Sequence, residues 1–256
     1  GTLHSERKQD TYAKEISIDQ VVMMGFKFYE KGSDYPFNGI IYQSDDQGHR
    51  QLRFTVRNGK THGYSEVWYE NGVKRSEILY RNGLRHGPYL AWHPNRQLGE
   101  VGVFKHGNRH GPYQYIYPNG QLGESGYFRN GKVNGRVRYW NNSGRKTKEI
   151  DYDNGEKQKA ILYHSDGSKE IYTVKNSLKH GLYQFWHNNR LTLREHYKNG
   201  IRHGKCETFY ESNGKKHMEI IYNQGTAESL KVWNELGQLI QKGKRKRATL
   251  EKRKIW

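Results

Sequence analysis

The sequence predicts an all-β protein: an elongated, single-layer antiparallel sheet of tandem β-hairpin repeats, each of about 24 residues. Three observations predict it: few aliphatic residues, many aromatic and glycine residues, and turn dipeptides at a fixed spacing. Leu, Ile, Val and Phe make up 49 of 256 residues (19%), and the formal net charge is +18. Such values are typical of disordered chains, but 20 Tyr, 6 Trp and 29 Gly favour a thin aromatic layer. A thick-cored α/β enzyme is a poor fit to this composition.

The first turn of each repeat carries Asn-Gly or a related dipeptide. Asn-Gly between alternating segments is the strongest short-range hairpin signal, because both turn residues need positive φ. A second glycine follows four residues later in most repeats, usually after a histidine. The dipeptides are Asn58-Gly59, Asn82-Gly83, His106-Gly107, Asn130-Gly131, Asn154-Gly155, Asn176-Ser177 and Asn199-Gly200.

A second turn follows nine or ten residues after that glycine, and each repeat then closes with a glutamate and an aromatic residue. About eight repeats of two strands and two turns are expected between Phe54 and Gln241. Strands spaced by roughly 4.8 Å would give a rod or curved ribbon of about 75–80 Å. The second turns are Asn71-Gly72, Asn95-Arg96, Asn119-Gly120, Ser143-Gly144, Asp166-Gly167, Asn189-Arg190, Asn213-Gly214 and Leu236-Gly237.

The segment Tyr80-Arg81-Asn82-Gly83-Leu84-Arg85-His86-Gly87-Pro88-Tyr89, with Trp92, resembles the MORN repeat (membrane occupation and recognition nexus). It is more similar still to the bacterial, YwqK-like antitoxin variant of that repeat. Phe28-Tyr29-Glu30-Lys31-Gly32, followed by Pro36-Phe37-Asn38-Gly39, resembles the start of those bacterial proteins. The resemblance covers residues 26–241 and implies a scaffold that binds a partner.

Three segments are expected. Residues 1–25 lack the repeat and form an N-terminal cap or a tail, residues 26–241 form the array, and residues 242–256 form a basic tail of net charge +7. The fifth repeat lacks His-Gly, and its strand at 160–163 is short. A bend or break near 153–176 is one interpretation, and harmless drift at solvent-facing turns is the other.

The repeated histidines do not have the pattern of a metal site. They recur once per repeat, so successive rings should lie about 10 Å apart, whereas zinc ligands converge at about 2.0–2.3 Å from the metal. No metal or cofactor is expected, and each ring should instead hydrogen-bond a neighbouring strand or the repeat glutamate. The histidines are His62, His86, His110, His180 and His203.

The glutamates and the single cysteine also favour a structural role. Seven evenly spaced glutamates are expected to pair with cations on adjacent strands, because a catalytic site is normally unique. Cys206 takes the place of tyrosines in other repeats and is expected to be a core thiol. The glycines are interpreted as turn glycines, and no enzyme is expected. The glutamates are Glu77, Glu100, Glu124, Glu149, Glu170, Glu195 and Glu219.

Two sets of residues are candidates for partner binding. The aromatic residues are either core or an exposed surface of the hot-spot type, and the basic residues either contact a partner or protect an open sheet edge. The aromatic candidates are Tyr89, Trp92, Tyr113, Tyr115, Tyr139, Trp140, Tyr183 and Trp186. The basic candidates, which share one equivalent position, are Arg85, Arg109, Lys179 and Arg202.

The resemblance implies an immunity protein that occludes a secreted antibacterial effector, such as a type VI lipase or phospholipase. The positive charge favours an effector with an acidic surface. The alternative is a membrane-associated scaffold that binds anionic phospholipids; the tail would then contact acidic lipid, or else only aid solubility. No nucleic-acid partner is expected, because no groove-reading module is recognisable. The expected location is the bacterial periplasm, with anchoring through a removed N-terminal segment or a cytoplasmic location as alternatives.

Overall fold

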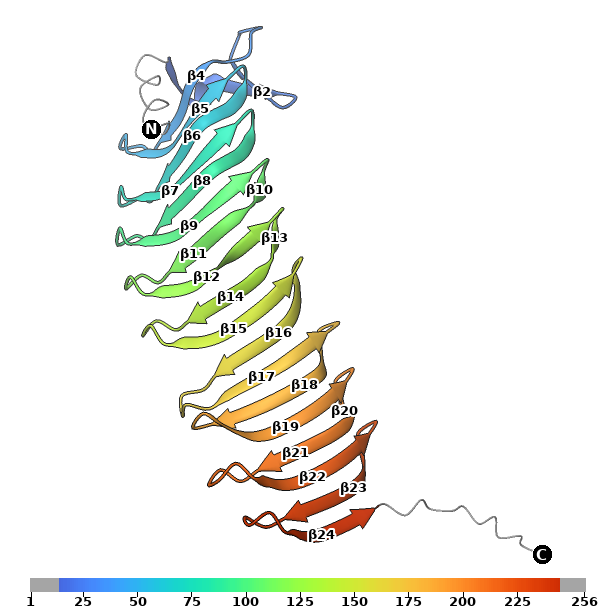
Figure 1. The fold of residues 1–256 in the computed structure, drawn as a ribbon. Coiled ribbons are helices and arrows are strands. Elements are labelled where there is room, and N and C mark those ends of the chain that lie inside the picture. The colour runs from blue at the N-terminus through green and yellow to red at the C-terminus, as the bar shows by residue number, and fades with distance from the viewer. Residues whose placement is uncertain (1–13, 245–256) are drawn as a thin grey trace, which may run out of the picture. The chain divides into compact units, whose positions relative to one another are not determined.

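The computed structural model describes residues 14–244, and these residues are almost entirely β-strand (Figure 1). The chain divides into two compact units, of which unit 1 ends at Arg145 and unit 2 begins at Lys146. After the first three strands, successive hairpins of each unit follow one another in chain order and pair edge to edge, and the second and third strands form a separate two-stranded sheet. The predicted fold class, an all-β single-layer antiparallel sheet of tandem hairpins, is confirmed.

Unit 1 contains a short N-terminal segment and then a run of hairpins. Its elements are β1 (Glu15–Ser17), the 3₁₀ helix η2 (Ile18–Gln20), β2 (Val21–Met24), β3 (Lys27–Glu30), β4 (Gly39–Ser44), β5 (Arg50–Arg57), β6 (Lys60–Trp68), β7 (Lys74–Arg81), β8 (Leu84–Trp92), β9 (Leu98–Lys105), β10 (Asn108–Arg109), β11 (Gly111–Ile116), β12 (Leu122–Arg129), β13 (Lys132–Val133) and β14 (Gly135–Trp140).

Unit 2 continues the same pattern to the end of the described chain. Its strands are β15 (Lys146–Asp153), β16 (Glu156–Tyr163), β17 (Lys169–Lys175), β18 (Leu178–His187), β19 (Arg190–Lys198), β20 (Ile201–Arg202), β21 (Gly204–Phe209), β22 (Lys216–Asn223), β23 (Thr226–Trp233) and β24 (Leu239–Lys244). Strand β16 has eight residues, so the expectation of a short strand after the fifth first turn is wrong.

The first turns have the predicted geometry. Both residues of each predicted dipeptide have positive φ, as a type I′ turn requires. Gln224-Gly225 has the same geometry and continues the series. One second turn differs from the prediction: positive φ falls on Asn188 and Asn189 rather than on Asn189-Arg190. Arg190 therefore begins β19.

The second glycine lies at a bulge within β8, at Gly87, or begins a strand after a one-residue break, at Gly111, Gly135 and Gly204. Gly87, Gly111, Gly135 and Gly204 all have positive φ, between 80° and 103°. In β8 this bulge falls between the pairs Tyr80–Arg85 and Ile78–Tyr89. A bulge adds a residue to one strand and increases the local twist, and glycine adopts its positive φ without steric cost.

The N-terminal residues that the structure describes form a cap. Strand β1 pairs in parallel with β4, placing Ile16 beside Ile41. Both side chains are buried in a hydrophobic cluster with Phe37, Phe54 and Val56. Covering the edge of β4 in this way protects it from unwanted strand pairing. Residues 1–13 of the expected segment lie outside the described residues.

The sheet continues through the other two places where a break or a boundary is expected. Strands β15 to β18 pair without interruption through residues 153–176, so the sheet is not broken there, and a bend stays a prediction. Strand β24 extends to Lys244, where it pairs with Ser229. Three residues of the expected tail therefore belong to the sheet, and residues 245–256 lie outside the described chain. Within residues 14–244, no helix is long and apolar enough to cross a membrane.

Candidate functional site

Alternation along the strands gives each unit two faces. One face, here called the aromatic face, carries a row of residues that lie opposite one another on successive strands. In unit 1 this axial row contains Tyr89, Gly102, Tyr113 and Gly126, and the pairs Tyr89–Gly102 and Tyr113–Gly126 are in direct register. Tyr113 is only 7% exposed. The aromatic face is therefore the core of this part of the sheet.

Two glycines of β12, Gly126 in this row and Gly123 near it, make room for the rings. A Cβ atom at Gly126 would lie 2.8 Å from Cε1 of Tyr113 and 3.0 Å from Cγ2 of Val137. A Cβ atom at Gly123 would lie 2.8 Å from Cδ1 of Tyr115. Neither glycine has positive φ in the structure. The interpretation of all glycines as turn glycines is thus wrong, because these strand glycines are required by packing.

Arginines cover the rings of unit 1. The guanidinium of Arg109 lies 5.8 Å from the ring centre of Tyr89, and Arg85 lies 4.4 Å from that of Phe104. Arg109 also donates to Glu100 at 2.6 Å, and the Tyr89 hydroxyl donates to the same carboxylate at 3.3 Å. Arg85 and Arg109 therefore pack onto the aromatic face, where cation–π contacts contribute about 0.5–2 kcal/mol each.

Unit 2 has a different axial row, formed by Tyr172, Tyr183, Glu195 and Cys206. Tyr172 pairs with Tyr183 and Tyr183 with Glu195, and the thiol of Cys206 lies 3.6 Å from the Glu195 carboxylate. Burial, followed by the charge of Glu195, raises the pKa of Cys206 to about 11. The thiol is buried and protonated at neutral pH, which confirms the expected core position.

The basic candidates of unit 2 are also part of this packing. The ammonium of Lys179 lies 4.2 Å from the ring centre of Tyr183, which is 9% exposed. Arg202 donates to Glu195 at 2.8 Å, and the Tyr197 hydroxyl donates to that carboxylate at 2.7 Å. Lys179 and Arg202 thus neutralise and cover a buried row.

The remaining aromatic candidates have several environments. Tyr115 is exposed and its ring meets that of Tyr117 edge to face at 5.4 Å. Tyr139 pairs with Glu124 on the aromatic face. The backbone carbonyls of Trp92 and Trp140 accept hydrogen bonds from the hydroxyls of Tyr69 and Tyr117, both at 3.0 Å. Trp186 lies under the ammonium of Lys169, at 5.1 Å.

The seven glutamates are not equivalent, because they lie on opposite faces. Those on the aromatic face accept from tyrosine, arginine or histidine: Glu100, Glu124, Glu170 and Glu195. Those on the opposite face accept from the lysine three residues earlier, at 2.6–2.8 Å: Glu77, Glu149 and Glu219. The sequence signal is the distance of the glutamate from the start of its strand. The pattern Leu-Gly-Glu places it on the aromatic face, and the pattern Lys-x-x-Glu places it on the opposite face. A shift of one residue moves a side chain to the other face.

The repeated histidines stabilise the next turn along the sheet. The ring nitrogen Nδ1 accepts a hydrogen bond from the first turn residue of the following repeat. The donors are the backbone N–H groups of Asn82, Asn130, Asn199 and Gln224, and the acceptors are His62, His110, His180 and His203, at 3.3–3.4 Å. Four of the five rings therefore hydrogen-bond the next turn rather than a strand or the repeat glutamate, and the fifth, His86, meets the ring of His106 edge to face at 5.3 Å.

The opposite face of unit 1, here called the open face, leaves apolar side chains exposed. Val103 is 37% and Tyr127 is 41% exposed, and Pro112 pairs directly with Tyr127. With Arg136 and Arg138 they line a shallow hollow of about 590 Å³. The candidate residues chosen from the sequence missed this surface, although alternation in Val101-Gly102-Val103-Phe104 places Val103 opposite the core.

The open face of unit 2 carries a network of charged side chains. Glu207 accepts from Arg194 at 2.8 Å and from Lys216 at 2.6 Å, and Lys216 also donates to Glu219 at 2.8 Å. Lys231 continues the series at 3.6 Å from Glu219. Burial raises the pKa of Glu207, but hydrogen bonds from Lys216 and the nearby Arg194 outweigh it, so the pKa lies below its ordinary value.

The chain was also compared with known proteins. No protein-family model matches it, and no curated protein matches its sequence. It is similar to accessory secretory proteins 1, 2 and 3 of Streptococcus pneumoniae, with 15% identity and a TM-score of 0.20 over 42% of this chain and 18% of that one.

Two further solved structures are similar to a comparable degree. A GtfA/B complex bound to UDP and GlcNAc has 15% identity and a TM-score of 0.18 over 67% of this chain and 36% of that one. TcdB2-TccC3 without its hypervariable C-terminal region has 11% identity and a TM-score of 0.14 over 86% and 16%. The chain spans between 16% and 36% of the length of these three chains. Similarity at this level carries no functional argument.

Proposed function

We propose that this chain is a non-catalytic protein-binding repeat protein whose partner contacts the open face of unit 1. The exposed pair Val103 and Tyr127, beside Pro112 and next to Arg136 and Arg138, is the observation that carries the proposal. Exposed apolar patches with a polar rim mark interaction sites, and tyrosine and arginine are enriched among hot-spot residues. Arginines at one end of the hollow favour a partner with acidic groups.

The finer proposal is that the partner is a toxic antibacterial effector and that binding blocks access to its active site. It rests on the resemblance of residues 26–241 to antitoxin-type repeats. Occlusion needs no chemistry from the binding protein, only an interface of about 800 Å² per partner. A secreted lipase or phospholipase is the proposed effector class, and the periplasm is the proposed location.

A co-purification experiment with the product of the neighbouring gene tests this proposal. Tyr127→Ala and Arg138→Ala should each weaken binding by about 1–2 kcal/mol, that is, roughly five- to thirtyfold. Lys159→Ala, on the open face of unit 2, is the matched control and should leave binding unchanged. Thermal unfolding of all three variants checks that the sheet is intact.

Toxicity provides the second readout. Co-expression of this chain with the effector should restore growth, and Tyr127→Ala should reduce that protection. Unaffected toxicity would refute the immunity function. Strong binding to anionic vesicles by a chain shortened to residues 1–244 would favour the membrane scaffold instead, because the basic segment 245–256 would then be unnecessary.

A further inference from the structure

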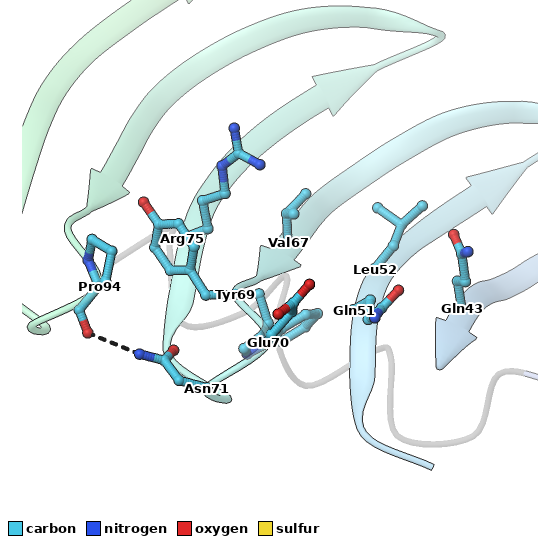
Figure 2. A pocket seen from close by; sticks show the side chains of 10 residues that line it. Gln43, Gln51, Leu52, Val67, Tyr69, Glu70, Asn71, Arg75 and Pro94 are labelled. Carbon is cyan, nitrogen blue, oxygen red and sulfur yellow. Dashed lines mark hydrogen bonds between the residues drawn. The ribbon is translucent and has the colours of Figure 1, made fainter. Parts of the chain in front are cut away.

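A second hollow lies on the aromatic face of unit 1, at the end of the strands near the second turns. It has a volume of about 710 Å³, within the range of about 300–1,000 Å³ typical of small-molecule sites. Figure 2 shows Gln43, Leu52 and Val67 projecting from one side of neighbouring strands, with Tyr69 and Arg75 beside them. The tyrosine and arginine form a wall over an apolar floor.

The hollow lies at the start of one row of the sheet, where Gln43, Leu52 and Val67 line it. Residues in register along this row are Gln43, Leu52, Val67, Ser76 and Ala91, followed by Glu100, Tyr115, Glu124 and Tyr139. Glutamate and tyrosine fill the later positions. At the start of the row, the side chains of Gln43, Leu52 and Val67 leave a ligand-sized space.

Hydrogen bonds and cations hold the wall in place. The Tyr69 hydroxyl donates to the carbonyl of Trp92 at 3.0 Å, and the Asn71 amide donates to the carbonyl of Pro94 at 3.2 Å (Figure 2). The guanidinium of Arg75 lies 5.7 Å from the ring centre of Tyr69. A site fixed before binding loses less conformational entropy when its ligand arrives.

The polar groups at the hollow can both donate and accept. Gln43 and Gln51 present side-chain amides, each with two donors and an acceptor, and across residues 14–244 the structure shows no hydrogen bond to either amide. Glu70 adds a carboxylate and Arg75 a planar guanidinium. Tyr69 adds an aromatic ring to the same lining, whereas the Trp68 ring lies under the ammonium of Lys74, at 5.8 Å, on the opposite face.

The charge at the site distinguishes among ligand classes. Glu70 and Arg75 balance each other, in contrast to the +18 charge of the whole chain. A phosphate or an anionic lipid headgroup would gain little net attraction here. A neutral ligand that offers one apolar surface and several hydroxyl groups fits the lining better.

We propose that this hollow binds a neutral oligosaccharide. A pyranose ring presents C–H groups on one face, which pack against aromatic rings, and hydroxyls around its rim, which both donate to and accept from amides, carboxylates and guanidinium groups. Tyr69 would contact the C–H face, while Gln43, Gln51, Glu70 and Arg75 would bind the hydroxyls. This site lies on the face opposite the proposed protein-binding surface, so the two proposals stand independently.

Titration of the full chain with chitotetraose, cellotetraose and maltotetraose, followed by isothermal calorimetry and saturation-transfer NMR, tests the proposal. At least one tetrasaccharide should bind with a Kd below roughly 1 mM. Tyr69→Ala and Gln43→Ala should each weaken that binding at least tenfold. Gln43 is exposed, so its variant should keep the unfolding temperature of the parent even if Tyr69→Ala does not. Gln114→Ala, on the open face, is the matched control.

The outcomes separate the proposal from its competitors. Binding that weakens with Gln43→Ala and not with Gln114→Ala supports the oligosaccharide site. Absence of binding of all three tetrasaccharides up to roughly 10 mM overturns it. Equal binding by the parent and Gln43→Ala also overturns it. Preferential binding of a proline-rich peptide in the same hollow overturns it as well.

Discussion

The two units bury different side chains at equivalent positions of the repeat. In unit 1 the axial row alternates Tyr89, Gly102, Tyr113 and Gly126, so large rings lie over missing side chains. In unit 2 the corresponding row contains Tyr172, Tyr183, Glu195 and Cys206, and a buried carboxylate replaces the glycine. The hairpin repeat therefore fixes where a side chain points and leaves open how the space is filled.

The open faces differ in a related way. In unit 1 a charged network of Arg53, Glu66, Lys74 and Glu77 lies at the start of the open face, and beyond it the row through Val103, Pro112 and Tyr127 is apolar. In unit 2 the residues of the open face include the charged network of Arg194, Glu207 and Lys216. A paired charge network has little need of a partner, whereas an exposed apolar row loses unfavourable contact with water when it is covered. This difference is why the proposed protein-binding surface lies on unit 1.

Glu195→Ala should have the largest effect on stability and should destabilise unit 2. The carboxylate is buried and accepts from Arg202 and Tyr197, and its removal leaves both donors without it. Breaking a buried pair costs about 3–5 kcal/mol, and because Arg202 is partly exposed we expect about 2–4 kcal/mol. Chemical denaturation, with hydrogen exchange resolved for β18 to β22, would measure it.

The control for this change is Glu156→Ala, an exposed glutamate of the same unit. It should alter the free energy of unfolding by less than about 0.5 kcal/mol. If Glu195→Ala and Glu156→Ala had equal effects, the buried carboxylate would not be a structural part of unit 2.

Gly126→Ala should destabilise unit 1 by about 1–3 kcal/mol. Its added methyl group would lie 2.8 Å from the Tyr113 ring, which is held by neighbouring strands. Gly243→Ala, in β24, has no atom within 4 Å of the added methyl and is the matched control. Thermal unfolding should show a loss only for Gly126→Ala. A neutral Gly126→Ala would mean that the rings of unit 1 repack freely.

The sequence was sufficient to predict the strands, because type I′ turns have a residue signature that does not depend on distant contacts. It was insufficient at Asn188-Asn189, where two asparagines and an arginine offer two registers and only the pairing of β18 with β19 selects one. Packing glycines such as Gly126 carry no local signal, since the ring that requires them lies on another strand.

The candidate binding residues show a second limit. Tyr113 and Tyr183 are candidates because of their residue type. Residue type alone does not distinguish a tyrosine in the core from a tyrosine on the surface. Alternation does reveal that Val103 and Tyr127 face away from that core. What alternation leaves undetermined is which face of a single-layer sheet is covered, because twist and neighbouring side chains decide it.

Unit 2 should also lose stability in acid through its charged open face. The pKa of Glu219 is lowered chiefly by the hydrogen bond from Lys216, and that of Glu207 also lies below its ordinary value of 4.5. A lowered folded-state pKa contributes stability that is present above 4.5 and lost as the pH falls through the folded value. We expect a loss of about 1 kcal/mol for each group, measured by urea denaturation between pH 7 and pH 3.

Glu207→Gln sharpens that measurement. It should lower stability at pH 7 and flatten the dependence below pH 4.5, because one of the titrating groups is gone. A parent and variant with parallel pH profiles would show that Glu207 does not contribute to the acid sensitivity.

The smallest effect is expected at the first turns, and there the two units should behave alike. His110 in unit 1 and His203 in unit 2 each accept a hydrogen bond, at 3.4 Å, from the backbone N–H of the next turn. These turns are exposed, so water replaces the lost acceptor, and His110→Ala and His203→Ala should each cost about 0.5–1 kcal/mol. Equal losses, measured by thermal unfolding, would show that the turn edge is a shared scaffold independent of the axial row. A clearly larger loss at His203 would instead mean that the carboxylate row of unit 2 depends on its turns more than the tyrosine–glycine row of unit 1 does.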